Sequence, residues 1–248
     1  MKLRKTAALL LLILTLLPVR PAFCEEALPL QGVTIGIDPG HQLIYDPDGE
    51  PVAPGSSRKK QKVAGGCRGI RSRVYEYEVN LNVGLYLRDL LTEAGAEVVL
   101  THDVLRVNIS NKQRAELFNA HEVDLGIRLH CNNADRQAAR GGVMLVPDKK
   151  HAGTHFVSDI FIGLTVLDHY IEVTGLPRKL KKGFLEFRDD QAGFNWCTRP
   201  VVCLEMGYLS NPEDDRLLSD PAFQQKMAQG IFEGICACFD ETGTLKIR

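Results

Sequence analysis

The sequence has 248 residues, of which 44% are hydrophobic and 25% charged, and its formal net charge is −1 at pH 7. This balance of charges excludes the strongly basic surface that is typical of nucleic-acid-binding domains. Seven cysteines are too few for a disulfide scaffold in a chain of this length, and without a Cys-x-x-Cys pair a thiolate zinc knuckle is disfavoured.

Residues 1–24 have the layout of a secretory signal peptide. Basic residues come first, a Leu-rich apolar run follows over residues 6–17, and small residues precede a predicted cleavage site before Glu25. The apolar run is shorter than the roughly 20 residues that span a bilayer. The alternative is an uncleaved N-terminal anchor, which would tether the protein to a membrane. Either way we expect an exported protein with a single domain over residues 25–248 and a core at about 32–239.

Strand-like and helix-like apolar patterns alternate along the rest of the chain. This alternation predicts an α/β fold, a single domain whose mixed, mostly parallel sheet has helices on both faces. Residues 42–75 are polar and rich in Gly, Pro, Lys and Arg, so they are predicted to form one long loop. The predicted strands are 33–37, 97–101, 123–129, 142–147, 184–187 and 201–204, and the predicted helices are 76–94, 110–120, 156–174 and 221–239.

Four residues of metal-binding or acid–base character stand at the ends of these elements. His41, His130 and Glu205 come directly after predicted strands, and Glu76 opens the first helix. Ligands of such sheets bind at the carboxyl ends of the strands, so these side chains can converge on one edge. Two imidazoles and a carboxylate are a common catalytic zinc set, and a further carboxylate can serve as general base.

Each of these residues also has a simpler interpretation. A histidine after a strand is often only a loop residue, and Glu76 could simply complement the dipole of its helix. Glu205 is harder to explain in this way, because it follows an apolar strand and a buried carboxylate needs a partner or a function. The topology alone therefore leaves the zinc site open.

Four segments together resemble the zinc-dependent N-acetylmuramoyl-L-alanine amidases of the type 3 family. They agree with the signatures of that family in order and spacing, and the resemblance covers about residues 32–239. The segments are Asp-Pro-Gly-His at 38–41, Glu-Tyr-Glu-Val-Asn-Leu at 76–81, Arg-Leu-His-Cys-Asn at 128–132 and Leu-Glu-Met-Gly-Tyr-Leu-Ser-Asn-Pro at 204–212.

The resemblance implies one Zn²⁺ per chain, with His41, Glu76 and His130 as ligands and Glu205 as the catalytic residue. It implies a fold similar to the zinc carboxypeptidase-like α/β architecture. The implied reaction is hydrolysis of the amide bond between N-acetylmuramic acid and L-alanine in peptidoglycan. Among family members, the chain looks most like stand-alone enzymes of spore-forming bacteria, including germination-specific cortex amidases.

Two departures from the usual family pattern lie beside the ligands. Gln42 follows the first histidine where many members have glycine, and Arg128 stands where many have serine. Neither departure removes a ligand. The loop at 42–75 looks longer than in many members, and its arginines are either in contact with substrate or solvated. We also expect Asn80, Asn132 and Asn195 to be candidates for substrate binding.

Two other functions remain open at this point. The first is a zinc peptidase that cleaves within the stem peptide, and the second is an inactive peptidoglycan-binding protein. The survival of all four site residues argues against the second. Peptidoglycan is the expected partner and nucleic acid is not, whereas the oligomeric state and the kind of wall attacked stay open.

Overall fold

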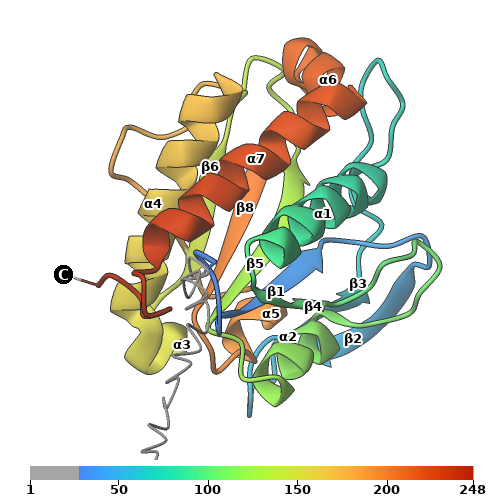
Figure 1. Ribbon diagram of the computed structural model, residues 1–248. Coiled ribbons are helices and arrows are strands. Elements are labelled where there is room, and N and C mark those ends of the chain that lie inside the picture. The colour runs from blue at the N-terminus through green and yellow to red at the C-terminus, as the bar shows by residue number, and fades with distance from the viewer. Residues whose placement is uncertain (1–27, 248) are drawn as a thin grey trace, which may run out of the picture.

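The computed structural model describes residues 28–247, which form a six-stranded sheet, a small two-stranded sheet and seven α-helices (Figure 1). The predicted signal peptide lies outside the described residues, and so does its predicted cleavage site. Within 28–247, none of the helices has the length and apolar character needed to span a membrane. The elements are β1 (Thr34–Pro39), β2 (Asp46–Pro51), β3 (Lys59–Val63), α1 (Glu76–Glu93), β4 (Glu97–Leu100), α2 (Asn111–Ala120), β5 (Leu125–Asn132), β6 (Val143–Pro147), α3 (Lys149–Ala152), η1 (Gly153–His155), α4 (Phe156–Thr174), β7 (Glu186–Arg188), α5 (Ala192–Asn195), β8 (Val201–Tyr208), α6 (Pro212–Leu218) and α7 (Pro221–Cys238).

The main sheet has the strand order β4-β1-β5-β8-β6-β7. All neighbouring strands in it are parallel except β6 and β8, which run antiparallel. The prediction of a mixed, mostly parallel sheet is therefore confirmed. The central strands β1, β5 and β8 end at the same edge, as parallel strands must, and the candidate site residues come from this edge.

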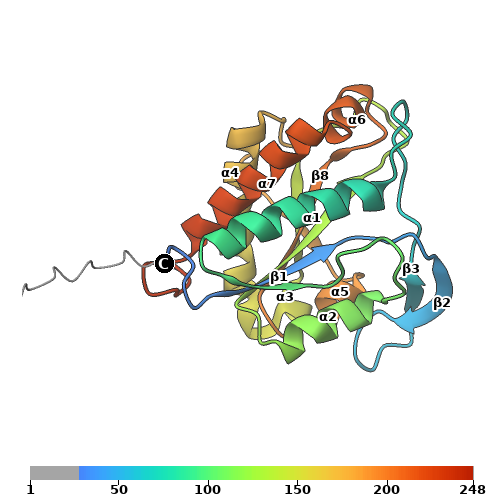
Figure 2. The same cartoon turned by 45° about the vertical axis from the view of Figure 1, so that its right-hand side comes forward.

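Helices cover both faces of the main sheet, as predicted (Figure 2). On one face α1, α4 and α7 pack together over a large apolar core that includes Ile37, Leu129 and Leu204. On the other face α2 and α5 enclose a smaller core around Phe118 and Phe194. Alternate residues of β8 point into the two cores, with Leu204 in the larger and Cys203 in the smaller, whereas the apolar residues of β5 all face the larger core. This alternation decides which side chains can reach the site.

The ends of several helices match their sequence signals. Ser110 accepts a hydrogen bond from the backbone of Gln113, whose side chain accepts one from Ser110 N–H, so the predicted capping box is present. Gly175 adopts the left-handed conformation with φ 73° and closes α4. The helix predicted over 76–94 begins at Glu76 and ends at Glu93.

Two predictions about the strands are corrected by the structure. Residues 42–75 do not form one loop, because β2 and β3 pair antiparallel within them. In addition, β5 and β8 are longer than predicted: His130 and Glu205 lie within these strands rather than after them. The polar side chains interrupt the apolar pattern, but backbone pairing continues through them up to an irregularity in register after His130.

Candidate metal centre

Three side chains from separate elements converge at the carboxyl edge of the sheet. His41 follows β1, Glu76 is the first residue of α1, and His130 lies near the end of β5. Glu76 Oε1 is 3.3 Å from His41 Nε2 and 3.1 Å from His130 Nδ1. The three potential ligand atoms all lie within 4.8 Å of one another. The predicted grouping of these three residues is therefore present in the fold.

The ring of His41 is oriented by its backbone and by one hydrogen bond. Its φ of 62° is left-handed, which is uncommon for a residue other than glycine and places the ring across the edge of β1. The Nδ1 atom lies 2.7 Å from the carbonyl oxygen of Ala64. Since a carbonyl can only accept, Nδ1 carries the proton and Nε2 keeps its lone pair toward Glu76.

The ring of His130 is oriented by close packing against Gly40. A Cβ atom at Gly40 would lie 2.3 Å from Nε2 of His130 and 2.2 Å from its Cε1, so only glycine leaves room for the ring. The same Cβ would lie 2.5 Å from Nδ1, the ring atom that lies 3.1 Å from Glu76 Oε1. Burial lowers the pKa of His130 to about 4, which keeps the imidazole neutral.

Glu76 is held as a carboxylate by its neighbours. Its Oε2 accepts a hydrogen bond from Cys67 N–H at 2.8 Å, and its Oε1 accepts one from Cys131 N–H at 3.1 Å. Burial alone would raise the pKa of Glu76, but the two histidines beside it hold that pKa well below its usual range. An ionised carboxylate between two imidazole nitrogens is a donor set that suits a divalent metal ion.

Glu205 lies beside these three residues and has different surroundings. It is the register partner of His130 across the β5–β8 pair, so the two side chains leave the sheet at the same height and on the same face. Its Oε2 is buried and has no hydrogen-bond partner among residues 28–247. Burial, followed by the negative charge of Glu76, raises the pKa of Glu205 to about 8. A carboxyl with such a pKa can exchange a proton near neutral pH.

Beneath the centre lies a buried charge network that the sequence did not reveal. Asp38 pairs with Arg114 at 2.6 Å and with Arg128 at 2.8 Å, and all three side chains are at most 5% exposed. Thr101 and His102, also buried, border the same network. Burial would raise the pKa of Asp38, but the two guanidinium groups lower it well below its usual range. Arg128, which stands where many family members have serine, thus belongs to the buried ion pairs on which the centre rests.

The three candidate asparagines differ in where the structure places them. Asn80 is fully buried and donates a hydrogen bond to the carbonyl of Gly40 at 3.0 Å, so it fixes the backbone before His41. Asn195 lines a separate hollow next to Asp189 and does not border the centre. Substrate binding by these residues stays a prediction. Asn132 does border the centre.

Comparison with known proteins agrees with this geometry. Residues 35–237 match the family model described as N-acetylmuramoyl-L-alanine amidase. The chain belongs to this family. As an N-acetylmuramoyl-L-alanine amidase it is a hydrolase that acts on peptidoglycan, and the resemblance stated from the four motifs is confirmed.

Several named amidases are similar to this chain. A germination-specific N-acetylmuramoyl-L-alanine amidase from Bacillus subtilis is 28% identical in an alignment of 233 residues that covers 88% of this chain and 84% of that protein. The N-acetylmuramoyl-L-alanine amidase Rv3717 from Mycobacterium tuberculosis is 24% identical and matches 83% of this chain and 86% of its own. The crystal structure of the amidase Ami1 from Mycobacterium smegmatis superposes with a TM-score of 0.76 at 23% identity, covering 84% of this chain and 97% of that one. This likeness supports the fold.

Proposed function

We propose that this amidase is zinc-dependent, with one Zn²⁺ held by His41, Glu76 and His130 and with Glu205 as its general base and acid. The observation that carries the proposal is the convergence of three oriented ligand atoms within 4.8 Å of one another. The donors fit the metal: two imidazole nitrogens and an ionised carboxylate are a common catalytic zinc set, and such a set leaves one coordination position for water or substrate.

Zinc at this position would polarise the scissile carbonyl and bring the pKa of a water molecule close to neutrality. Glu205 then supplies the proton transfer. Its Oε2, which has no hydrogen-bond partner among residues 28–247, accepts a proton from the attacking water and later donates it to the leaving nitrogen of L-alanine. Asn80 and Ala64 act indirectly, by fixing the backbone before His41 and the ring of His41.

The bond we assign is the amide between the lactyl group of N-acetylmuramic acid and L-alanine. We further propose that the enzyme is exported through residues 1–24, because its substrate lies outside the cytoplasm. Similarity to a germination-specific amidase favours a role in spore germination among the possible wall substrates.

A stem-peptide zinc peptidase is the competing function, since the same centre could cut a bond between amino acids. Digesting purified peptidoglycan with the zinc-loaded protein and identifying the products by mass spectrometry separates the two functions. The amidase releases intact stem peptides and leaves a free lactyl carboxyl on muramic acid. Shortened peptides still attached to muramic acid would instead assign the peptidase.

The roles of the residues are tested by a variant and by removal of the metal. We expect Glu205→Ala to bind zinc as the wild type does and to lose its hydrolytic activity, because Glu205 is the base and not a ligand. A chelator should abolish the activity of the wild type, and added zinc should restore it. Full activity in Glu205→Ala would refute the assigned proton transfer, and activity after complete chelation would refute the role of zinc.

A further inference from the structure

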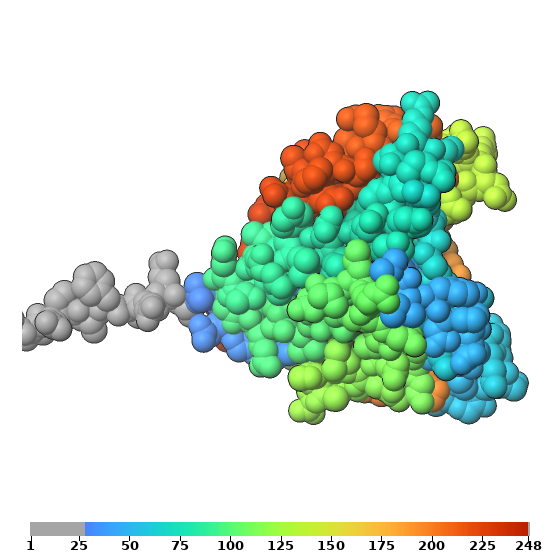
Figure 3. Space-filling model, turned by 90° about the vertical axis from the view of Figure 1, so that its right-hand side faces the viewer, coloured from blue at the N-terminus to red at the C-terminus, as the bar shows by residue number. Residues whose placement is uncertain are grey.

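Two hollows open onto the centre from different sides. One has a volume of about 690 Å³ and the other about 330 Å³. Both are bordered by His41, Ala64, His130 and Glu205, and from these shared residues they extend along different elements. The outline of the molecule is indented at its right side in Figure 3, between the blue β2–β3 region and the yellow-green segment that follows β5. The two hollows thus offer separate space for the two sides of a bond cut at the centre.

The larger hollow has a positive wall. Lys59 and Lys60 of β3 line it together with Arg128, and its acidic side chains are Asp190 and, at the centre, Glu205. Lys60 is paired with Asp190 at 2.6 Å, and Arg128 is paired with Asp38 beneath the hollow. Lys59 makes no ion pair with any residue in 28–247, so its charge is available to a ligand.

The stem of Lys59 is placed by the glycine opposite it. A Cβ atom at Gly49 of β2 would lie 3.3 Å from Cδ of Lys59, so the missing side chain makes room for the lysine to lie across the hairpin. Gly49 itself borders the larger hollow. The stem of Lys59 therefore lies along the same wall of the hollow as Gly49.

The hairpin that carries Lys59 is fixed to the body of the protein. Trp196 Nε1 donates a hydrogen bond to the carbonyl of Pro51 at 2.9 Å. Glu50 accepts one from Lys112 N–H at 3.1 Å, and Asn111 donates one to the carbonyl of Lys62 at 3.0 Å. The positive wall is thus formed before substrate binds, which lowers the cost of ordering it.

The smaller hollow carries no charge of its own beyond the residues of the centre. Its further lining consists of glycines, thiols and amides, with Asn132 and Asn133 at its rim. Amide groups donate to and accept from neutral groups, so this lining suits hydroxyl and acetamido groups. The two hollows therefore differ in charge, positive on one side of the scissile bond and neutral on the other.

From this asymmetry we propose that the larger hollow is the subsite for the stem peptide and that Lys59 selects peptides with a free carboxylate near L-alanine. The N-acetylmuramic acid part then occupies the smaller hollow. This inference rests on the proposed function, because it assumes that the scissile bond joins a neutral sugar to an acidic peptide. The attraction between Lys59 and the carboxylate would be modest, since the lysine is exposed.

The test compares two soluble substrates in the zinc-loaded enzyme. One is N-acetylmuramoyl-L-alanyl-D-glutamate, whose peptide part has free carboxylates, and the other is its amide, whose peptide part is uncharged. We expect the wild type to prefer the acid in kcat/KM. Lys59→Gln should lower kcat/KM for the acid by about two- to fivefold, the range of an exposed ion pair, and leave the amide unchanged.

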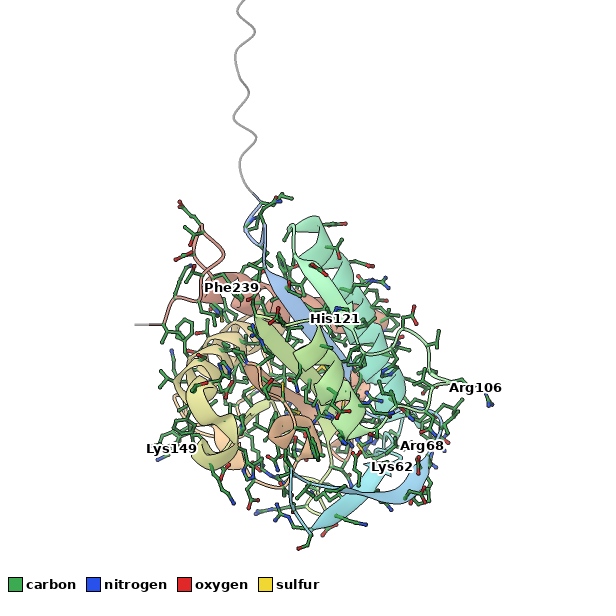
Figure 4. The ribbon with its side chains drawn as sticks, turned by 90° about the horizontal axis from the view of Figure 1, so that it is seen from below. Lys62, Arg68, Arg106, His121, Lys149 and Phe239 are labelled. Carbon is green, nitrogen blue, oxygen red and sulfur yellow. The ribbon has the colours of Figure 1, made fainter. Side chains whose placement is uncertain are left out.

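Two further variants sharpen the test. Lys62→Gln makes the same change on the same strand (Figure 4), but Lys62 pairs with Asp48 and does not line the hollow, so the preference should stay. Asp190→Asn frees Lys60 and should increase the preference for the acid. Equal cleavage of both substrates by wild type and Lys59→Gln would overturn the inference and leave the proposed function standing. Cleavage of neither substrate, with peptides released by cuts elsewhere, would overturn the proposed function itself.

Discussion

Replacing Gly40 with alanine tests whether the position of His130 allows a metal to bind at the centre. The φ of Gly40 is not left-handed, so alanine is compatible with the backbone there and the substitution acts only through its new Cβ. That atom would lie 2.2 Å from Cε1 of His130, whereas ordinary contacts begin at 3.4 Å. The backbone cannot yield easily, because Gly40 N–H donates to Leu129 and Asn80 donates to its carbonyl. The ring of His130 must therefore retreat by about 1 Å.

A shift of this size is large for a metal ligand. Loss of a group that orients a ligand typically weakens metal affinity by about 10- to 100-fold, and we expect Gly40→Ala to lower zinc affinity within that range. Activity measured at saturating zinc should still fall by about 100-fold, because a misplacement of about 1 Å is costly to the reaction. The fold should survive with a loss of about 1–3 kcal/mol in the free energy of unfolding, as overpacking usually costs.

Zinc affinity is measured by competition with a chelating dye, and unfolding by denaturant titration of the same samples. The matched control is Gly65→Ala, because a Cβ at Gly65 would meet nothing within 4 Å although this residue also borders the centre. The control should bind zinc as the wild type does. If Gly40→Ala bound zinc as tightly as the control, the position of His130 would not determine metal binding and the reasoning would be refuted.

Two buried charges give further predictions. Arg128→Met should lower the free energy of unfolding, measured with denaturant, by about 3–5 kcal/mol, because it leaves Asp38 buried with one cation in place of two. The control Arg88→Met should lower it by less than about 1 kcal/mol, because Arg88 forms its ion pair on the surface. Burial raises the pKa of Asp159 from 3.8 to about 7. Asp159 therefore lowers the free energy of unfolding by an amount that is absent at low pH and grows as the pH rises between these two values. Asp159→Asn should therefore raise the free energy of unfolding at pH 8 by up to about 4 kcal/mol and by less at pH 5, and a gain independent of pH would contradict this cause.

The convergence of His41, Glu76 and His130 could be predicted because it depends on topology and on short motifs. Parallel strands end at one edge of the sheet. Because β1, β5 and β8 are adjacent in the middle of the sheet, residues that follow β1 or lie near the ends of β5 and β8 must be close together. The sequence could not show which polar side chains near the centre are buried beneath it and which are open to a ligand. Asn80 shares the helix face of Glu76, as its spacing requires. It is buried beneath the centre, however, and its side-chain amide donates a hydrogen bond to the carbonyl of Gly40.

The β2–β3 hairpin could not be predicted because its strands carry no apolar alternation. The residues of β2 are Asp-Pro-Asp-Gly-Glu-Pro and those of β3 are mostly lysine, so neither reads as a strand. What holds the hairpin is tertiary: the indole N–H of Trp196 and the backbone of Lys112 each bond to β2 from distant parts of the chain. Such contacts leave no periodic signal in the local sequence.

Arg128 shows how a departure from a family pattern can be interpreted physically. A charged residue inside an apolar strand needs a buried partner, and Asp38 is its register partner across the β1–β5 pair. The network that results also acts on the centre. Burial lowers the pKa of His130 to about 4, His41 adds to the lowering, and the positive charge of Arg128 makes a smaller contribution in the same direction. The guanidinium group thus favours the neutral imidazole of His130, which a serine at this position could not do through charge.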